Sequence, residues 1–120
     1  MLRLFVYGTL MRGGPRHHLL AGQRFLGPAR TAAHWALHDL GAYPGLVRRA
    51  QDGLVIAGEL YEIDPSLVPA LDQAEGAPAL YRLEELDLVD IPGPVFAYVY
   101  QRDVAQQPLV PGSRWRNGEA

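Results

Sequence analysis

The sequence predicts an α+β fold: a small mixed, mostly antiparallel sheet that curls toward a β-barrel, with one or two helices packed on it. Three observations favour this class. About six segments have the short apolar, β-branched or aromatic pattern of strands. Only one segment has a good helical pattern, and one other has a poor one. The strand–helix–strand rhythm of a doubly wound parallel sheet does not recur along the chain.

The length of the chain fits one domain. Its 120 residues lie within the usual range of about 100–200 residues per domain. A content of 48% hydrophobic and 20% charged residues is typical of globular proteins. We therefore predict a single domain over residues 1–120. Its tail, from about residue 104 onward, is expected to pack loosely because glutamine and proline are frequent there.

The first third of the chain contains an apolar strand and a weaker helix. Residues 3–7 predict a buried strand that stops at a Gly-Thr pair. Residues 16–21 predict a short helix that a glycine ends. The weakly alternating residues 24–39 predict one bent strand or two strands, interrupted at a Gly-Pro pair. The Gly-Ala-Tyr-Pro-Gly sequence at 41–45 predicts a turn.

Four later segments have the apolar pattern of strands: residues 46–48, 54–63, 81–91 and 95–101. Turn residues at 51–53 predict that the first two segments form a hairpin. A tight Pro-Gly-Pro turn at 92–94 is predicted to join the last two.

The stronger helix is predicted between these two pairs of strands. Asp64 suits the N-cap and Pro65 the first helical position, where no N–H donor is needed. Four apolar residues then fall on one helical face: Leu67, Val68, Leu71 and Ala74. Gly76 suits the C-terminal cap.

The composition excludes several kinds of chemistry. All 11 basic residues are arginine, cysteine is absent, and the chain has only two serines and two threonines. A cysteine or lysine nucleophile, a disulfide, a thiolate metal site and the lysine of a P-loop are therefore impossible. A reaction that needs no nucleophile from the enzyme is favoured.

Charge and hydropathy argue against nucleic acids and membranes as partners. The net charge of −2 lacks the basic excess of nucleic-acid-binding domains. No apolar run approaches the ~18–20 residues of a spanning helix, and the first residues do not form a signal peptide. We expect a cytoplasmic protein, monomeric or weakly dimeric, that acts on a small molecule.

Glu75 is the first candidate catalytic residue. A carboxylate at the C-terminal end of a helix meets the negative end of the helix dipole, and packing against a curved sheet would desolvate it. Both effects raise a pKa toward the range that serves a general acid or base. A solvated surface glutamate before a capping glycine is the simpler interpretation of the position alone.

The residues after the first strand form the second candidate site. A buried strand that ends in Gly8 and Thr9 presents consecutive backbone N–H groups at a sheet edge. Such groups bind a carboxylate or an oxyanion. An ordinary strand-to-loop turn is the alternative interpretation.

Two histidines form the third candidate site, which would make the protein a metal-assisted hydrolase. His34 and His38 have the spacing that places two imidazoles on one face of a helix, as in metal sites. Their segment predicts a strand, however, in which residues four apart are separated by about 13 Å. No third metal ligand is evident, so this is the weakest of the three candidate sites.

Four motifs follow one another in a set order and spacing: VYGTLMRG at 6–13, GAYPG at 41–45, VIAGELY at 55–61 and LDQAEGAPALYR at 71–82. Together they resemble the γ-glutamylcyclotransferase-like family, and in particular its γ-glutamylamine cyclotransferase and bacterial AIG2-like branch. The resemblance extends over residues 3–102. It implies a small mixed β-barrel with flanking helices.

The resemblance also implies an activity: a γ-glutamyl amide is cleaved into 5-oxoproline and a free amine. It assigns the general acid/base role to Glu75 and the substrate contacts to five residues: Tyr7, Gly8, Thr9, Leu10 and Tyr81. Because the substrate's own α-amine attacks its γ-carbonyl, neither a cofactor nor a metal is expected. The motifs do not distinguish peptide, isopeptide and polyamine donors. A non-catalytic module that binds a small carboxylate or an amino acid in the same pocket is the alternative.

Overall fold

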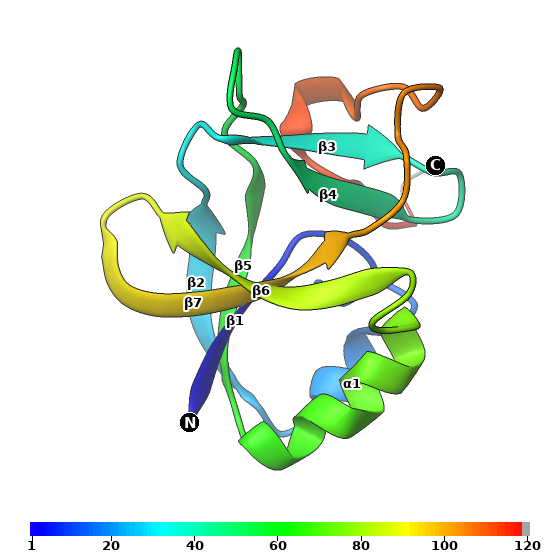
Figure 1. Cartoon of the computed structure of the whole chain (residues 1–120). Coiled ribbons are helices and arrows are strands. Elements are labelled where there is room, and N and C mark those ends of the chain that lie inside the picture. Colours follow the sequence, from blue (N-terminus) through cyan, green and yellow to red (C-terminus); the bar gives the residue numbers. More distant parts are fainter. Residues whose placement is uncertain (119–120) are drawn as a thin grey trace.

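The computed structural model describes residues 1–118, whose strands form one five-stranded and one two-stranded sheet (Figure 1). The strands are β1 (Leu2–Val6), β2 (Arg24–Arg30), β3 (Trp35–Asp39), β4 (Pro44–Arg48), β5 (Ala57–Ile63), β6 (Tyr81–Leu88) and β7 (Ile91–Tyr100). The main helix is α1 (Val68–Glu75), and the short 3-10 turns are η1 (His17–Leu20), η2 (Pro65–Leu67) and η3 (Pro111–Ser113). The predicted α+β class with a mostly antiparallel sheet is confirmed.

The five-stranded sheet has the order β2-β5-β1-β7-β6, with β1 and β7 parallel and the other neighbours antiparallel. The predicted barrel is wrong, because the sheet is open. Its edge strands β2 and β6 meet only near one isolated bridge, between Thr31 and Leu88. Closure into a barrel needs a continuous, staggered ladder between the edge strands, and here only their ends come within hydrogen-bonding distance.

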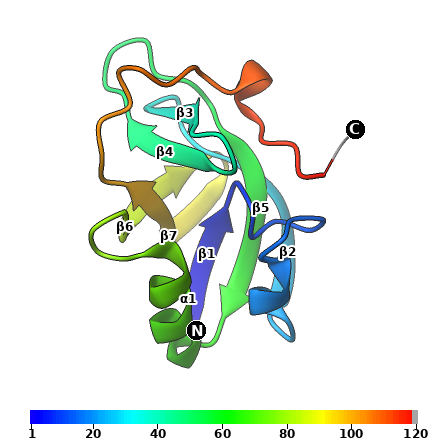
Figure 2. The ribbon, with the colours of Figure 1, turned by 90° about the vertical axis from the view of Figure 1, so that its right-hand side faces the viewer.

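Strand β1 is the centre of the molecule, with buried side chains on both faces. Phe5 and Tyr7 pack into one hydrophobic cluster with Leu37 of the β3–β4 hairpin. Leu4 and Val6 pack into a second cluster, which also contains Leu71 of α1 and Tyr98 of β7. In Figure 1 the hairpin lies above the main sheet and α1 lies below it, and Figure 2 shows the same two layers after a quarter turn. An apolar strand with no polar face is therefore the expected sequence for this position.

The boundaries of α1 follow the predicted capping residues. The Asp64 carboxylate accepts a hydrogen bond from the Ser66 N–H (2.9 Å), which begins the turn η2 that continues into α1. Gly76 ends the helix in the left-handed region at φ 68°, a conformation that glycine adopts without a Cβ penalty. This cap makes Glu75 the last helical residue. Of the helices in residues 1–118, none has the length and apolarity that crossing a membrane requires.

Two predicted hairpins are wrong in their pairing or their turn. Strand β4 pairs with β3, whereas β5 pairs with β1 and β2. A local turn signal at 51–53 does not specify a partner, and Gly53 instead packs against the backbone at Ala33. The last hairpin turns at Val89 and Asp90, so the Pro-Gly-Pro sequence at 92–94 belongs to β7.

Most described residues after 104 are exposed, and the tail contacts the rest of the protein at a few points. Val110 is buried, and its N–H donates to the Leu37 carbonyl (2.8 Å). Near the end, the Asn117 side-chain amide donates to the Gly8 carbonyl (2.9 Å). These contacts depend on residues that are distant in sequence, which composition does not reveal.

Candidate active site

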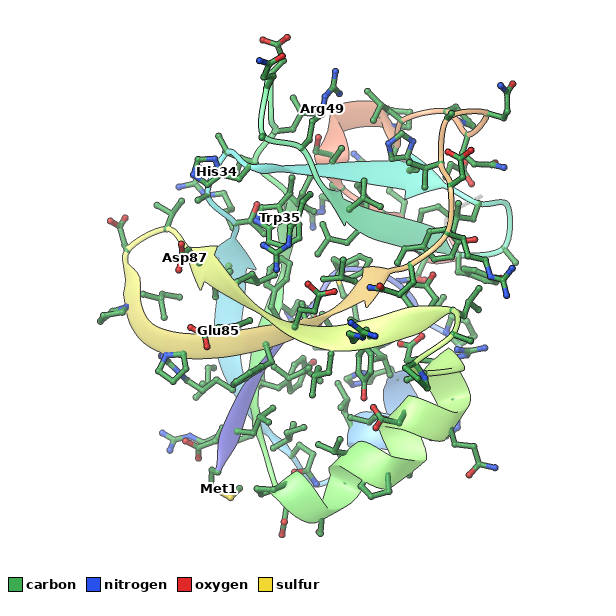
Figure 3. All side chains as sticks on the ribbon, viewed as in Figure 1. Met1, His34, Trp35, Arg49, Glu85 and Asp87 are labelled. Carbon is green, nitrogen blue, oxygen red and sulfur yellow. The ribbon has the colours of Figure 1, made fainter. Side chains whose placement is uncertain are left out.

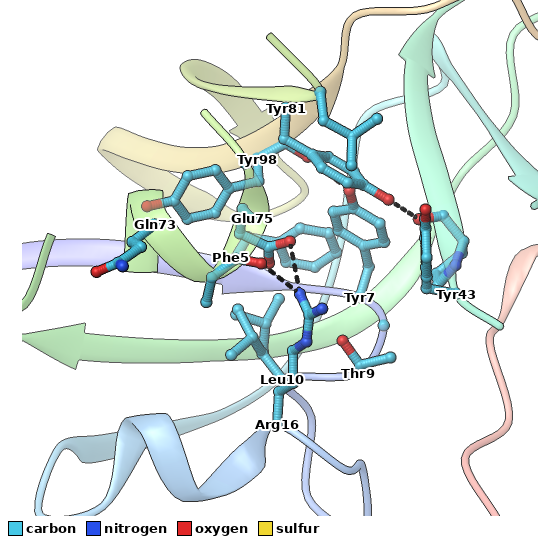
Figure 4. Close-up of a pocket in the computed structure, with 16 residues that line it drawn as sticks. Phe5, Tyr7, Thr9, Leu10, Arg16, Tyr43, Gln73, Glu75, Tyr81 and Tyr98 are labelled. Atoms are coloured by element: carbon cyan, nitrogen blue, oxygen red, sulfur yellow. Dashed lines mark hydrogen bonds and ion pairs between the residues drawn. The ribbon is translucent and has the colours of Figure 1, made fainter. Parts of the chain in front are cut away.

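A cavity of about 180 Å³ lies where the end of β1, the C-terminal end of α1 and the start of β6 meet (Figure 4). All the site residues predicted from the sequence line it: Tyr7, Gly8, Thr9, Leu10, Glu75 and Tyr81. Tyr43, Tyr98 and Arg16 also line it. The volume is below the ~300–1,000 Å³ of sites for drug-sized ligands, so the cavity suits one small ligand.

Glu75 reaches this cavity from the end of α1. Only 11% of its side chain is exposed, and burial raises its pKa from the ordinary value of 4.5 to about 7, against an opposing effect of Arg16. The negative end of the α1 dipole acts in the same direction as burial. A pKa in this range allows a carboxyl group both to accept and to donate a proton near neutral pH.

Arg16 is the cation nearest to this carboxylate. Its Nη1 lies 3.6 Å from Glu75 Oε2 and donates to the Ala74 carbonyl (2.7 Å), where the helix has free acceptors (Figure 4). Arg16 was not predicted from the sequence. It belongs to none of the site motifs, and its contact joins residues 58 apart along the chain.

Replacing Arg16 by glutamine is expected to raise the pKa of Glu75 above about 7, because the guanidinium favours the ionised carboxylate. NMR titration of the Glu75 carboxyl carbon measures this directly. The matched control is Arg48→Gln, which removes an arginine that pairs with Glu84 (2.9 Å) instead. An unchanged or lower pKa in Arg16→Gln would contradict the assigned interaction.

Three tyrosines form a hydrogen-bonded wall of the cavity. The Tyr7 hydroxyl donates to the Tyr98 carbonyl (2.5 Å), and the Tyr81 hydroxyl donates to the Pro44 carbonyl (2.7 Å). The Tyr98 hydroxyl in turn donates to Asp72 Oδ1 (2.7 Å). Burial is the main cause that raises the pKa of all three hydroxyls; the next cause is Tyr81 for Tyr7, Glu75 for Tyr81 and Asp72 for Tyr98. They stay neutral at physiological pH and hold the wall in one arrangement.

Residues 8–10 line the same cavity, and the carbonyls of Gly8 and Thr9 accept hydrogen bonds from within the protein. The Gly8 carbonyl accepts from the Met11 N–H (3.1 Å), and the Thr9 carbonyl accepts from the Arg16 N–H (3.0 Å). Within residues 1–118, the N–H groups of Gly8, Thr9 and Leu10 make no hydrogen bond to protein atoms. Three successive donors beside the cavity are therefore available for an anion.

Gly8 packs closely against the ring of Pro44, which leaves no room for a side chain at position 8. A Cβ at this position would lie 2.7 Å from Pro44 Cγ. We expect Gly8→Ala to lower the free energy of unfolding by about 1–3 kcal/mol, as overpacking does, in a urea titration. Adding Pro44→Ala should restore part of this loss, because it removes the ring atoms. No recovery in the double variant would contradict this packing role.

The two spaced histidines lie away from the cavity. His38 is on β3, where its Nδ1 is 2.9 Å from the Gln107 carbonyl oxygen. His34 precedes β3 at the end of the hairpin farther from α1 (Figure 3). In the described part of the chain, no three His, Cys, Asp or Glu side chains are grouped as metal ligands.

The comparisons with known proteins agree with the motifs. The sequence profile of the family described as "Gamma-glutamyl cyclotransferase, AIG2-like" matches residues 4–117. A Vibrio cholerae protein, provisionally named a gamma-glutamylcyclotransferase, is 37% identical over 113 residues, which cover 93% of each chain. The gamma-glutamylaminecyclotransferase of Rattus norvegicus is 35% identical over 73% of this chain, and the match covers 64% of the rat protein.

Comparison with solved structures also finds an AIG2-like protein. The crystal structure of an AIG2-like protein from Mus musculus superposes with a TM-score of 0.84 at 25% identity, over 97% of this chain and 88% of the mouse chain. The mouse match spans both the main sheet and the tail. This chain belongs to the AIG2-like gamma-glutamyl cyclotransferase family.

Proposed function

We propose that the protein is a cofactor-free cyclotransferase that converts γ-glutamyl amines or γ-glutamyl peptides into 5-oxoproline and a free amine. The observation that carries the proposal is the position of Glu75. Its carboxyl group, with a pKa of about 7, lines the same small cavity as the unpaired N–H groups of residues 8–10. Membership of the family supports the reaction class.

In the proposed reaction, the Glu75 carboxylate removes a proton from the α-ammonium group of the substrate. The neutral amine then attacks the γ-carbonyl carbon and closes a five-membered ring through a tetrahedral oxyanion. Protonated Glu75 returns this proton to the leaving nitrogen as its bond to carbon breaks, and the ring nitrogen loses its second proton to solvent, which leaves a neutral lactam and a free amine. No water is consumed, and correct folding of the substrate supplies an effective molarity of ~10⁵ M or more.

The remaining residues would hold the substrate in this folded shape. The N–H groups of Gly8, Thr9 and Leu10 bind either the substrate carboxylate or the developing oxyanion. Tyr81 and Tyr7 limit the space in which the γ-glutamyl chain can extend, since their hydroxyls are already bonded to backbone carbonyls. Arg16 favours the ionised form of the Glu75 carboxylate, which the first step needs.

Among the possible donors, γ-glutamylamines are the preferred substrate class. The name of the rat relative states activity on γ-glutamylamines, and the small cavity holds the γ-glutamyl group rather than the amine part. The amine would extend to the surface, so peptide, isopeptide and polyamine donors share the contacts inside.

Turnover of a γ-glutamyl amine and of its α-N-acetyl analogue tests the proposal. The free amine should yield equal amounts of 5-oxoproline and released amine by mass spectrometry, and the acetylated analogue should yield neither, because its nitrogen does not attack. Release of glutamate from both would indicate a hydrolase. Stabilisation by 5-oxoproline without turnover of any donor would favour the binding module.

A further inference from the structure

A second and larger cavity lies outside the proposed active site. It has a volume of about 460 Å³ and is bounded by residues 11–12, by 28–30 of β2, by 57–59 of β5 and by 114–117 of the tail. It shares no lining residue with the cavity of Glu75. Its volume lies within the ~300–1,000 Å³ of small-molecule sites. The space is sufficient for a ligand that the proposed reaction does not use.

The walls of this second cavity concentrate positive charge. Four arginines line it: Arg12, Arg30, Arg114 and Arg116. Glu59 is the only carboxylate among its lining residues in the described part of the chain. Four of the chain's 11 arginines thus gather at one cavity of a protein whose net charge is −2. Like charges held together repel one another, and a bound anion removes this repulsion.

Two of these arginines have unused donors. Arg12 is engaged, because its Nε donates to Glu59 Oε2 (3.2 Å) and its guanidinium lies over the Phe25 ring (4.1 Å). Arg30 and Arg114, by contrast, make no ion pair or side-chain hydrogen bond to any residue within 1–118. Each guanidinium offers a planar fork of N–H donors that matches phosphate oxygens in pairs.

The tail that supplies Arg114 is fixed in place. Trp115 packs against both hydrophobic clusters of the molecule. Its Nε1–H donates to Asn117 Oδ1 (3.1 Å), and the Asn117 amide donates to the Gly8 carbonyl (2.9 Å). The arginines on either side of Trp115 are thereby presented on ordered backbone. Such preorganisation lowers the entropy cost of binding.

We propose that this cavity binds a small phosphate-bearing anion, held by the guanidinium groups of Arg30 and Arg114 with Arg12 as a third cation. Phosphate fits better than a single carboxylate, because three cations gather around one site and a phosphate group carries up to two negative charges. A small molecule fits better than a nucleic acid, because the chain as a whole has a net charge of −2 and lacks the basic excess of nucleic-acid-binding domains. The site is independent of the proposed reaction.

Calorimetric titration of the whole protein with inorganic pyrophosphate tests the site. We expect saturable binding of one anion per chain, and a dissociation constant at least about tenfold weaker in Arg30→Gln and in Arg114→Gln, which corresponds to the loss of one charged contact. The matched control is Arg24→Gln, which removes an exposed arginine of the same strand β2 that does not line the cavity. It should bind like the parent.

Three results would overturn the proposal. They are the absence of saturable binding to the parent protein, an equal loss of affinity in Arg24→Gln, and binding of citrate at least as tight as that of pyrophosphate. Tighter binding of a single-stranded oligonucleotide than of pyrophosphate would replace the small-molecule ligand by a nucleic acid. Thermal melting of each variant separates loss of binding from loss of folding. Because the readout is binding, failure of the proposed reaction leaves this test unaffected.

Discussion

Replacing Glu75 by glutamine is expected to lower kcat/KM for 5-oxoproline release by about 10²–10⁴-fold, the usual contribution of a general acid/base. Glutamine keeps the shape and hydrogen-bonding groups of the side chain but does not take up the proton of the substrate's α-ammonium group. Chromatographic measurement of 5-oxoproline at several substrate concentrations gives kcat and KM separately. Loss in kcat with little change in KM is expected, because the substrate contacts remain.

Glu85→Gln is the matched control for this change. Glu85 is exposed on β6 and does not line the cavity of Glu75. The same substitution there should leave kcat/KM within about twofold of the parent, because surface substitutions have small effects. A Glu75→Gln protein that works at the parental rate would show that another group carries the proton.

The same Glu75→Gln change is expected to stabilise the protein above pH 7 by about 3 kcal/mol. Folding raises the pKa of Glu75 from 4.5 to about 7, and each pKa unit corresponds to about 1.4 kcal/mol. The folded state therefore favours the protonated carboxyl. The contribution of Glu75 to stability is fully present below pH 4.5 and is lost as the pH rises to about 7.

Urea unfolding of both proteins at pH 4.5 and pH 8 measures this effect. The glutamine variant does not ionise, so the difference in free energy of unfolding should be small at the lower pH and close to its full value at the higher pH. Comparison of the two pH values separates the charge from any change in packing. A variant that is less stable than the parent at pH 8 would contradict the burial of an ionised Glu75.

Several features of the site follow from local sequence. Asp64 and Gly76 set the two ends of the helical segment, because capping acts on N–H and carbonyl groups within one turn. The apolar run at residues 3–7 predicts a buried strand, and both faces of β1 contact a hydrophobic cluster. The position of Glu75 at the end of the helix is therefore predictable from sequence alone.

Other features depend on pairing between distant segments. The turn at 51–53 predicts a hairpin of neighbouring strands, yet β5 pairs with β1 and β2 at the centre of the sheet. Trp35, which lies between the hairpin and the main sheet (Figure 3), is buried in the cluster that fixes β3 and β4 there. The predicted barrel failed for the same reason, since closure depends on how far the edge strands β2 and β6 run side by side.

The sequence by itself determined the class of fold, the ends of the helix, the family motifs and the absence of a lysine or cysteine nucleophile. These depend on residue type and on spacings of a few residues. Only the tertiary structure decided that Arg16 faces Glu75, that the sheet stays open, and that the tail brings Arg114 toward Arg30. Burial and charge act through space, so the pKa of a carboxyl and the lining of a cavity are set by residues that no local pattern brings together.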